Sequence, residues 1–194
     1  MKRTVLLALA LLAAACSPKM SVASPDGRIA VRVSLDAEGI PFYQVDADGR
    51  PLLTPSVLGL LSEEANLDRN FRVRTSRVRT FRETWHQPWG ENKEVTDHHQ
   101  ELLLKLVNDS DVELTVTFRV FDDGLGFRYA YSVPGADTLR IVGERTQFAF
   151  ASDATTWSIP GDFNSYEHLY RRMPLSELRD ANTPLTLKFS DSLY

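Results

Sequence analysis

Apolar and polar residues alternate along most of the chain, and this period of two predicts half-buried antiparallel strands. In residues 29–35, isoleucine, valine and leucine alternate with arginine, alanine and serine. The two longest alternating runs, 112–120 and 125–133, are separated by Asp122-Asp123-Gly124, which predicts a β-hairpin. Further strands are predicted at 42–47 (ending in the turn-forming pair Asp48-Gly49), 71–73, 102–107, around 148–150, and 185–189.

Helical periodicity is scarce in this sequence. Residues 174–181 have a short helical pattern that starts with a proline at a first-turn position. The spacing of the predicted strands leaves no room for strand–helix–strand units, which excludes a doubly wound parallel sheet. Short strands with frequent turn signals therefore predict an all-β fold, an antiparallel sandwich or barrel.

The first 15 residues have the pattern of a bacterial secretory signal peptide. Two basic residues precede an unbroken apolar run over 5–15, which is too short to span a membrane comfortably. Cys16 follows directly and resembles the cysteine of a lipobox, which is diacylated and becomes the first mature residue. Ala13 departs from that motif, because it stands at the position where leucine is commonest. The alternative is cleavage without lipidation. We expect export to the periplasm or the outer membrane, with possible membrane attachment through a lipid on Cys16.

The rest of the chain is predicted to be a short linker, 16–23, and one β domain, 24–194. A hydrophobic fraction of 43% is ordinary for a globular protein, and a single cysteine excludes an internal disulfide or a CxxC metal site. The formal net charge of −4 becomes −6 once the two basic leader residues are removed, because 20 basic then face 26 acidic residues. No nucleic acid is therefore expected as a partner. The last residues read as a strand and the start of another, so the domain is expected to be incomplete at its C-terminus.

Two tryptophans, Trp85 and Trp89, flank a loop that also contains histidine, glutamine, proline and glycine. Aromatic rings beside polar groups suit carbohydrates, because the C–H faces of sugars stack on them. The alternative is that both rings cap the hydrophobic core.

Three groups of charged residues have simpler structural interpretations. Six arginines between residues 69 and 82 predict a solvated or salt-bridged sheet face in a chain that is acidic overall. Neighbouring His98 and His99 point to opposite faces of a strand, so they cannot easily bind one metal ion. Asp122 and Asp123 are turn formers, since the two carboxyl groups of a glycosidase must face each other across a sugar.

Residues 162–170 contain more aromatic and polar side chains than a simple connection needs. A carboxylate held among tyrosine and asparagine can bind a hard cation such as calcium, or a sugar hydroxyl. The alternative is a surface loop whose aromatic rings pack locally.

Several short motifs, in their order along the chain, resemble the N-terminal part of glycoside hydrolase family 97 proteins. His99 departs from the family pattern, in which tyrosine is expected, and Gly126 stands where alanine is usual. The motifs are Ser24-Pro25-Asp26-Gly27, Ser56-Val57-Leu58-Gly59-Leu60, Trp85 with Trp89-Gly90-Glu91, Asp122-Asp123-Gly124 with Phe127-Arg128-Tyr129, Tyr166-Glu167 with Tyr170, and Thr183-Pro184-Leu185-Thr186.

The resemblance implies an antiparallel β-super-sandwich, similar to galactose mutarotase, that precedes a (β/α)₈ catalytic barrel. Members of this family are exported, exo-acting α-glucosidases and α-galactosidases with calcium at the active site and catalytic carboxylates on the barrel. The chain would then be the domain that completes the pocket for an α-linked oligosaccharide, without catalytic residues of its own and without the barrel. Glu167 looks like the calcium ligand that this domain contributes. The alternative is a stand-alone, exported carbohydrate-binding lipoprotein that uses Trp85 and Trp89.

Overall fold

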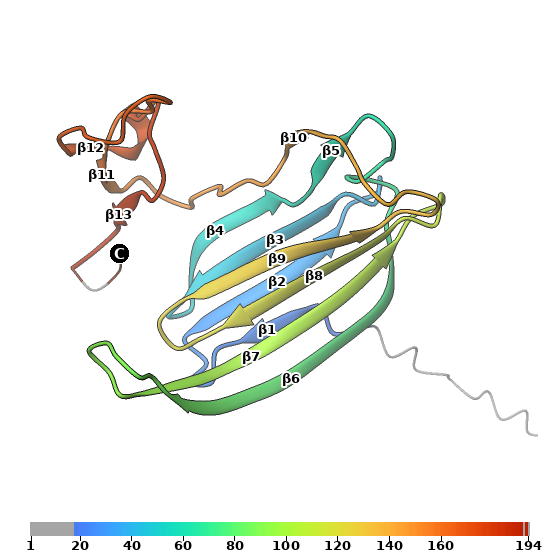
Figure 1. The fold of residues 1–194 in the computed structure, drawn as a ribbon, viewed down its shortest axis with the longest axis horizontal. Coiled ribbons are helices and arrows are strands. Elements are labelled where there is room, and N and C mark those ends of the chain that lie inside the picture. The colour runs from blue at the N-terminus through green and yellow to red at the C-terminus, as the bar shows by residue number, and fades with distance from the viewer. Residues whose placement is uncertain (1–17, 192, 194) are drawn as a thin grey trace, which may run out of the picture.

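Two antiparallel sheets lie face to face and form the main body of the protein (Figure 1). The computed structural model describes residues 18–191 and 193, so the predicted leader and Cys16 lie outside the described residues. In the first sheet, each strand pairs with the next along the chain, in the order β1-β2-β3-β4. Its strands are β1 (Ser21–Ala23), β2 (Ile29–Leu35), β3 (Pro41–Ala47) and β4 (Arg50–Val57).

The second sheet has the order β6-β7-β8-β9 and contains the two longest strands. The predicted turn at Asp122-Asp123-Gly124 joins β8 to β9, and the Phe121 N–H donates to the Gly124 carbonyl over 2.8 Å. Strands β6 and β7 extend well beyond β8, so the tip of their hairpin projects past the sandwich (Figure 1). The strands are β6 (Arg72–His86), β7 (Glu94–Val107), β8 (Glu113–Val120) and β9 (Leu125–Ser132).

The hydrophobic core fills the space between the two sheets. Because side chains alternate between the two faces of a strand, every second residue of β2, β3, β7 and β8 points inward. The Tyr43 ring of the first sheet contacts Phe118 and Phe127 of the second, with centroid distances of 5.9 and 5.3 Å. Each large side chain buried in this way contributes about 1.5–3 kcal/mol relative to an exposed one. The predicted all-β, antiparallel sandwich is confirmed.

Strand β1 lies inside the segment that the sequence predicts to be a linker, 16–23. It pairs with β2, and the Val33 N–H donates to the Met20 carbonyl over 2.8 Å. Val22 is buried in the core, which explains why these residues are held as a strand. The linker prediction is therefore wrong for this part of the segment.

The chain between residues 141 and 151 covers the outer edge of the first sheet. Strand β10 (Ile141–Glu144) pairs with β5 (Leu60–Ser62), and the following residues run along β4. The Thr54 N–H donates to the Ala149 carbonyl over 2.8 Å, and the Ala151 N–H donates to the Leu52 carbonyl over 3.0 Å. The strand predicted around Phe148 and Phe150 is thus extended, but its one regular pairing is the bridge between Leu53 and Phe150.

The remaining residues, from Ala154 onward, form a smaller C-terminal lobe beside the sandwich (Figure 1). The helix predicted over 174–181 is wrong except for the 3₁₀ turn η1 (Leu175–Glu177). Leu178 is extended, and the Asp153 carboxylate accepts hydrogen bonds from Ser176, which fixes a single turn. Within residues 18–191 and 193, no helix has the length and apolar character that crossing a bilayer requires. The lobe strands are β11 (Thr155–Ser158), β12 (Arg171–Pro174) and β13 (Thr186–Lys188), in the order β12-β11-β13.

Candidate functional site

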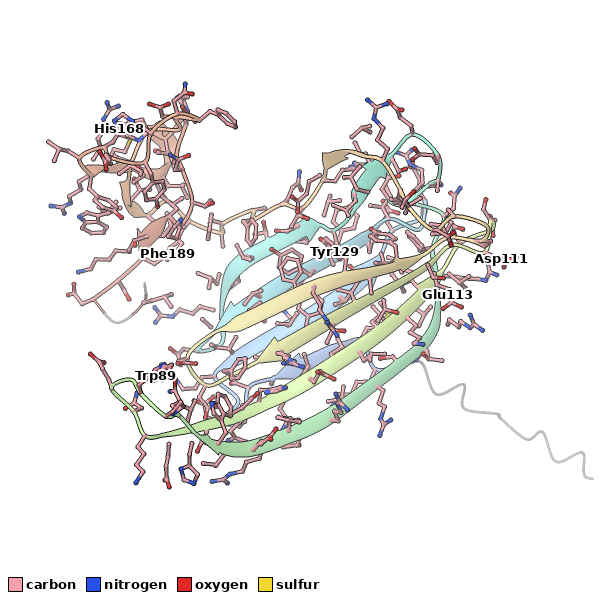
Figure 2. The ribbon with its side chains drawn as sticks, viewed as in Figure 1. Trp89, Asp111, Glu113, Tyr129, His168 and Phe189 are labelled. Atoms are coloured by element: carbon pink, nitrogen blue, oxygen red, sulfur yellow. The ribbon has the colours of Figure 1, made fainter. Side chains whose placement is uncertain are left out.

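The features that the sequence singled out gather at one end of the sandwich. Figure 2 places Trp89, His168 and Phe189 at this end and Asp111 and Glu113 at the opposite end. Trp89 lies at the tip of the β6–β7 hairpin, whereas His168 and Phe189 belong to the C-terminal lobe. We call this end of the molecule the loop end.

The lobe loop 162–170 presents large apolar side chains to solvent. Phe163 is fully exposed, and Leu169 is 91% exposed. Tyr166 and Tyr170 are also exposed, so the interpretation that these rings pack locally is wrong. Such a concentration of exposed apolar surface is typical of a face that contacts a partner or a ligand.

Glu167 lies in the middle of this loop and is exposed. Its backbone N–H donates to the Ser165 hydroxyl over 3.2 Å, while its carboxylate has no hydrogen-bond or ion-pair partner within the described residues. Asp162 is different, because its carboxylate accepts from the Asn164 N–H at 2.9 Å and lies 3.0 Å from His168 Nε2. The Asn164 hydrogen bond, together with His168, lowers the pKa of Asp162. Asp162 thus shapes the loop and leaves Glu167 available.

The loop suits one calcium ligand rather than a complete site. Calcium binds about six to eight oxygen atoms, mostly from carboxylates, carbonyls and water. The described part of the chain contains no group of three or more His, Cys, Asp or Glu side chains placed to hold a metal. Glu167 offers a hard carboxylate donor that has no other partner among these residues, so its chemistry fits that of one calcium ligand and does not make a complete site.

The two tryptophans lie on the projecting hairpin, not against the core. Trp85 pairs with Val95 near the end of the ladder, and the Gln87 N–H donates to the Lys93 carbonyl at 2.9 Å across the base of the loop. The exposed fractions are 44% for Trp85 and 84% for Trp89. The alternative that these rings cap the core is therefore wrong, and both are accessible to a ligand.

A cavity of about 690 Å³ opens between the two sheets at the loop end. The Tyr43, Phe127 and Phe148 side chains form its apolar wall, and the Asp48 and Asp122 turns form its mouth. The Tyr43 hydroxyl is already used, since it donates to the Gln147 carbonyl over 2.8 Å. This cavity could not be predicted from the sequence, because residues from four strands and from several turns and connecting segments make it together.

The paired aspartates of the β8–β9 turn are structural, as predicted. Asp122 accepts a hydrogen bond from the Asp26 N–H over 2.8 Å, which ties this turn to the first sheet. Asp123 is exposed beside it at the same turn. The two carboxyl groups come from adjacent residues of one turn, so they do not flank a space for a sugar.

The two neighbouring histidines lie on opposite faces of β7, as predicted. His99 is buried between the rings of Phe81 and Phe121, with centroid distances of 5.0 and 4.9 Å. Its Nδ1 is hydrogen-bonded to Asp97. His99 therefore packs within the sheet face, and it lies in no metal-binding group of the described residues.

The arginine-rich strand β6 forms a salt-bridged face, as the sequence predicts. Arg72 pairs with Asp109 at 3.0 Å, and Arg74 pairs with Glu113. The sequence did not predict the ion pairs of the most buried of these acids, Glu101, which contacts arginines on both neighbouring strands. The signal that could have revealed it is the pairing of three strands, which sets these residues side by side.

Comparison with known proteins agrees with this architecture. A family model described as the N-terminal domain of glycosyl hydrolase 97 matches residues 22–194. A probable retaining alpha-galactosidase from Streptomyces bingchenggensis is 31% identical over 140 residues, which cover 71% of this chain and 22% of that protein.

Solved structures show the same fold at similar identity. A glycoside hydrolase family 97 enzyme from Pseudoalteromonas sp. strain K8, in complex with panose, has a TM-score of 0.79 and 31% identity. The alignment covers 87% of this chain and 26% of that enzyme. A beta-arabinopyranosidase has a TM-score of 0.68 and 25% identity, over 78% of this chain and 26% of its own. The chain thus spans about a quarter of the length of the relatives it matches, and it belongs to glycoside hydrolase family 97, whose N-terminal domain it represents.

Proposed function

We propose that this chain is the pocket-completing N-terminal domain of an exported, calcium-dependent exo-α-glycosidase that acts on α-linked oligosaccharides, of the α-glucosidase or α-galactosidase type. The observation that carries the proposal is the exposed loop 162–170, which presents an unused carboxylate among large apolar side chains at the loop end. The family membership and the relatives described as a retaining alpha-galactosidase and as a complex with panose support the substrate class.

In this proposal the domain contributes binding and orientation, while the rest of the enzyme contributes the chemistry. The exposed apolar side chains of Phe163, Leu169 and Tyr170 would be covered by the catalytic domain, which would place Glu167 at the edge of the substrate pocket. Calcium, when bound, would supply a positive charge that orients a sugar hydroxyl or stabilises negative charge that develops on oxygen. The catalytic acid and base would come from the barrel, where the family resemblance places the catalytic carboxylates.

The Glu167 assignment is tested in the longer enzyme of which this domain would be the N-terminal part. We expect Glu167→Gln to weaken calcium binding by at least about tenfold, as loss of a charged ligand from such a site does. Activity should then recover at higher calcium concentration. Glu177→Gln is the matched control, because Glu177 is also exposed in the lobe. Equal calcium affinity in the two variants would show that Glu167 is not a ligand.

The existence of the longer enzyme has a test of its own. The coding sequence that follows Tyr194 should continue in frame into a barrel with catalytic carboxylates. A stop codon at this point would instead favour the alternative, a stand-alone carbohydrate-binding protein.

The exposure of Trp85 and Trp89 is the observation that favours this second candidate. If the chain binds glycans by itself, Trp89→Ala should abolish retention on immobilised α-glucan, because each lost stacking contact removes a large contact area. Phe163→Ala is the control, since it removes an equally exposed ring from the lobe instead of the hairpin. Equal retention of wild type and Trp89→Ala would exclude the hairpin as a glycan site.

Export and lipidation are separate parts of the proposal. Mass spectrometry of protein from the membrane fraction should find a diacylglyceryl group on Cys16 and no residues before it. A soluble periplasmic protein that starts at another residue would contradict lipidation and leave export intact.

A further inference from the structure

The outward face of the second sheet groups basic side chains around the buried carboxylate of Glu101. Successive residues of β6, β7, β8 and β9 lie opposite one another there, and five basic residues lie near Glu101, while the other acids of this face, Glu83, Asp97 and Glu113, lie towards its two ends. The proposed function makes no use of this face. The basic residues are Arg77, Arg79, Lys105, Arg119 and Arg128.

Glu101 fixes two of these arginines in place. It is 2% exposed, although it points away from the core, because the side chains around it cover it. Arg79 Nε donates to one carboxylate oxygen over 2.8 Å, and Arg119 Nε donates to the other over 3.1 Å. Burial raises the pKa of Glu101, but these two hydrogen bonds outweigh it and hold the pKa below the ordinary glutamate value.

Both contacts to Glu101 use Nε, so the outer ends of the two guanidinium groups remain available. Within the described residues, the terminal Nη atoms of Arg79 and Arg119 make no hydrogen bond, and Arg128 has no hydrogen-bond or ion-pair partner. A guanidinium fork binds carboxylate, sulfate or phosphate through two parallel N–H···O bonds. Glu101 thus fixes the positions of Arg79 and Arg119 without using their terminal N–H donors.

A hollow of about 380 Å³ lies beside these donors. Gly126 sits opposite Arg119, and a Cβ placed on it would meet no atom within 4 Å, so the hollow is open at this position. Thr117 lies opposite Arg128 and adds a hydroxyl. Phe121 closes one side, and the stacked rings of His99 and Phe81 support it.

We propose that this hollow is a binding site for a small oxyanion, namely the carboxylate or sulfate group of an acidic saccharide or the corresponding free inorganic ion. Arg119 and Arg128 would bind the oxygen atoms, Thr117 would donate a further hydrogen bond, and Glu101 would act as a positioning residue. The site lies on a sheet face, away from loop 162–170, and does not depend on Glu167 or calcium.

Nuclear magnetic resonance titration of the 194-residue chain tests this site with three probes: galacturonate, sodium sulfate and uncharged galactose. We expect galacturonate and sulfate to shift the Gly126 amide and the arginine Nε–H signals, with dissociation constants on the order of 1 mM. Galactose should cause no shift, because it lacks the charged group. If galacturonate binds at least tenfold more tightly than sulfate, the site recognises an acidic sugar, and equal affinities assign it to the free ion.

Two substitutions at Arg128 separate this site from general electrostatic attraction. Arg128→Gln and Arg128→Lys should each weaken binding at least tenfold, because neither keeps the bidentate fork. Arg77→Gln removes the same charge from the same face outside the hollow and should change affinity by less than about twofold. Circular dichroism verifies that each variant is folded. The proposal is overturned if no probe shifts these signals, or if Arg77→Gln and Arg128→Gln weaken binding equally.

Discussion

The sandwich buries its large apolar side chains, whereas the C-terminal lobe exposes several of its own. Residues such as Leu104 and Phe118 are completely buried between the two sheets, within one continuous core cluster. The lobe buries a few residues of β11 and β13 and leaves the rings of loop 162–170 in solvent. Stability therefore resides in the sandwich, and the exposed lobe loop is the part to which we assign recognition in the proposed function, since functional loops are often positioned by a rigid scaffold.

The largest expected effect separates two phenylalanines. Phe118→Ala should lower the free energy of unfolding by about 3–5 kcal/mol, because it removes a ring from the closed core and leaves a cavity. Phe163→Ala should change it by less than about 0.5 kcal/mol, since that ring is already in water. Urea unfolding followed by circular dichroism measures both. Similar values for the two variants would contradict the division between sandwich and lobe.

A smaller effect concerns the buried acid of the second sheet. Glu101→Gln should cost about 1–3 kcal/mol at neutral pH, because two charge-assisted hydrogen bonds are weakened. The pKa of Glu101 is lowered in the folded protein, so its contribution is present above the ordinary glutamate pKa of about 4.3 and is lost as the pH falls below it. The variant should therefore lose stability less steeply than wild type in acid.

The control for this acid lies in the lobe. Glu177→Gln removes an exposed carboxylate and should leave both the stability and its pH dependence unchanged. If Glu101→Gln gave the same acid unfolding curve as Glu177→Gln, the two arginine contacts would contribute nothing to the sheet.

The smallest expected effect concerns the free energy of local opening, which should be lower in the lobe loop than in the sandwich and which limited proteolysis reports. Loop 162–170 exposes several residues that chymotrypsin cleaves, whereas those of β8 and β9 face the core or lie in a ladder. Under native conditions we expect the first cuts within this loop, because local opening costs less there than unfolding of the sandwich. Mass spectrometry of the fragments identifies the sites, and first cuts within β8 or β9 would contradict this.

Sequence periodicity predicted the sandwich well where one face of a strand is buried. The alternation in 112–120 and 125–133 and the turn at Asp122 all appear in the structure. Over β6 the apolar period was clear only at 71–73, and the arginines up to residue 82 were predicted only as a sheet face, because arginine and threonine leave most of this strand exposed. Where a strand buries few side chains, and those only partly, its sequence shows little of the apolar period that identifies it.

The candidate site was predictable in composition but not in geometry. The density of aromatic and polar residues singled out loop 162–170, whose apolar side chains are exposed in the structure. The exposure of Trp89 follows from how far β6 and β7 extend beyond β8, which the sequence does not show. The contacts of Glu101 with Arg79 and Arg119 depend on the register of three strands. A shift of one residue in one strand would move all of its side chains to the other face. Such sites become visible once strand pairing is known.

Whether this chain is catalytic by itself is decided by hydrolysis of p-nitrophenyl α-glucoside and α-galactoside by the purified 194-residue chain, with calcium present. We expect no release of p-nitrophenol above the uncatalysed rate, because a domain that only completes a pocket would lack the acid and base that cleave the bond. Release at enzymatic rates by material shown to be free of other glycosidases would contradict it.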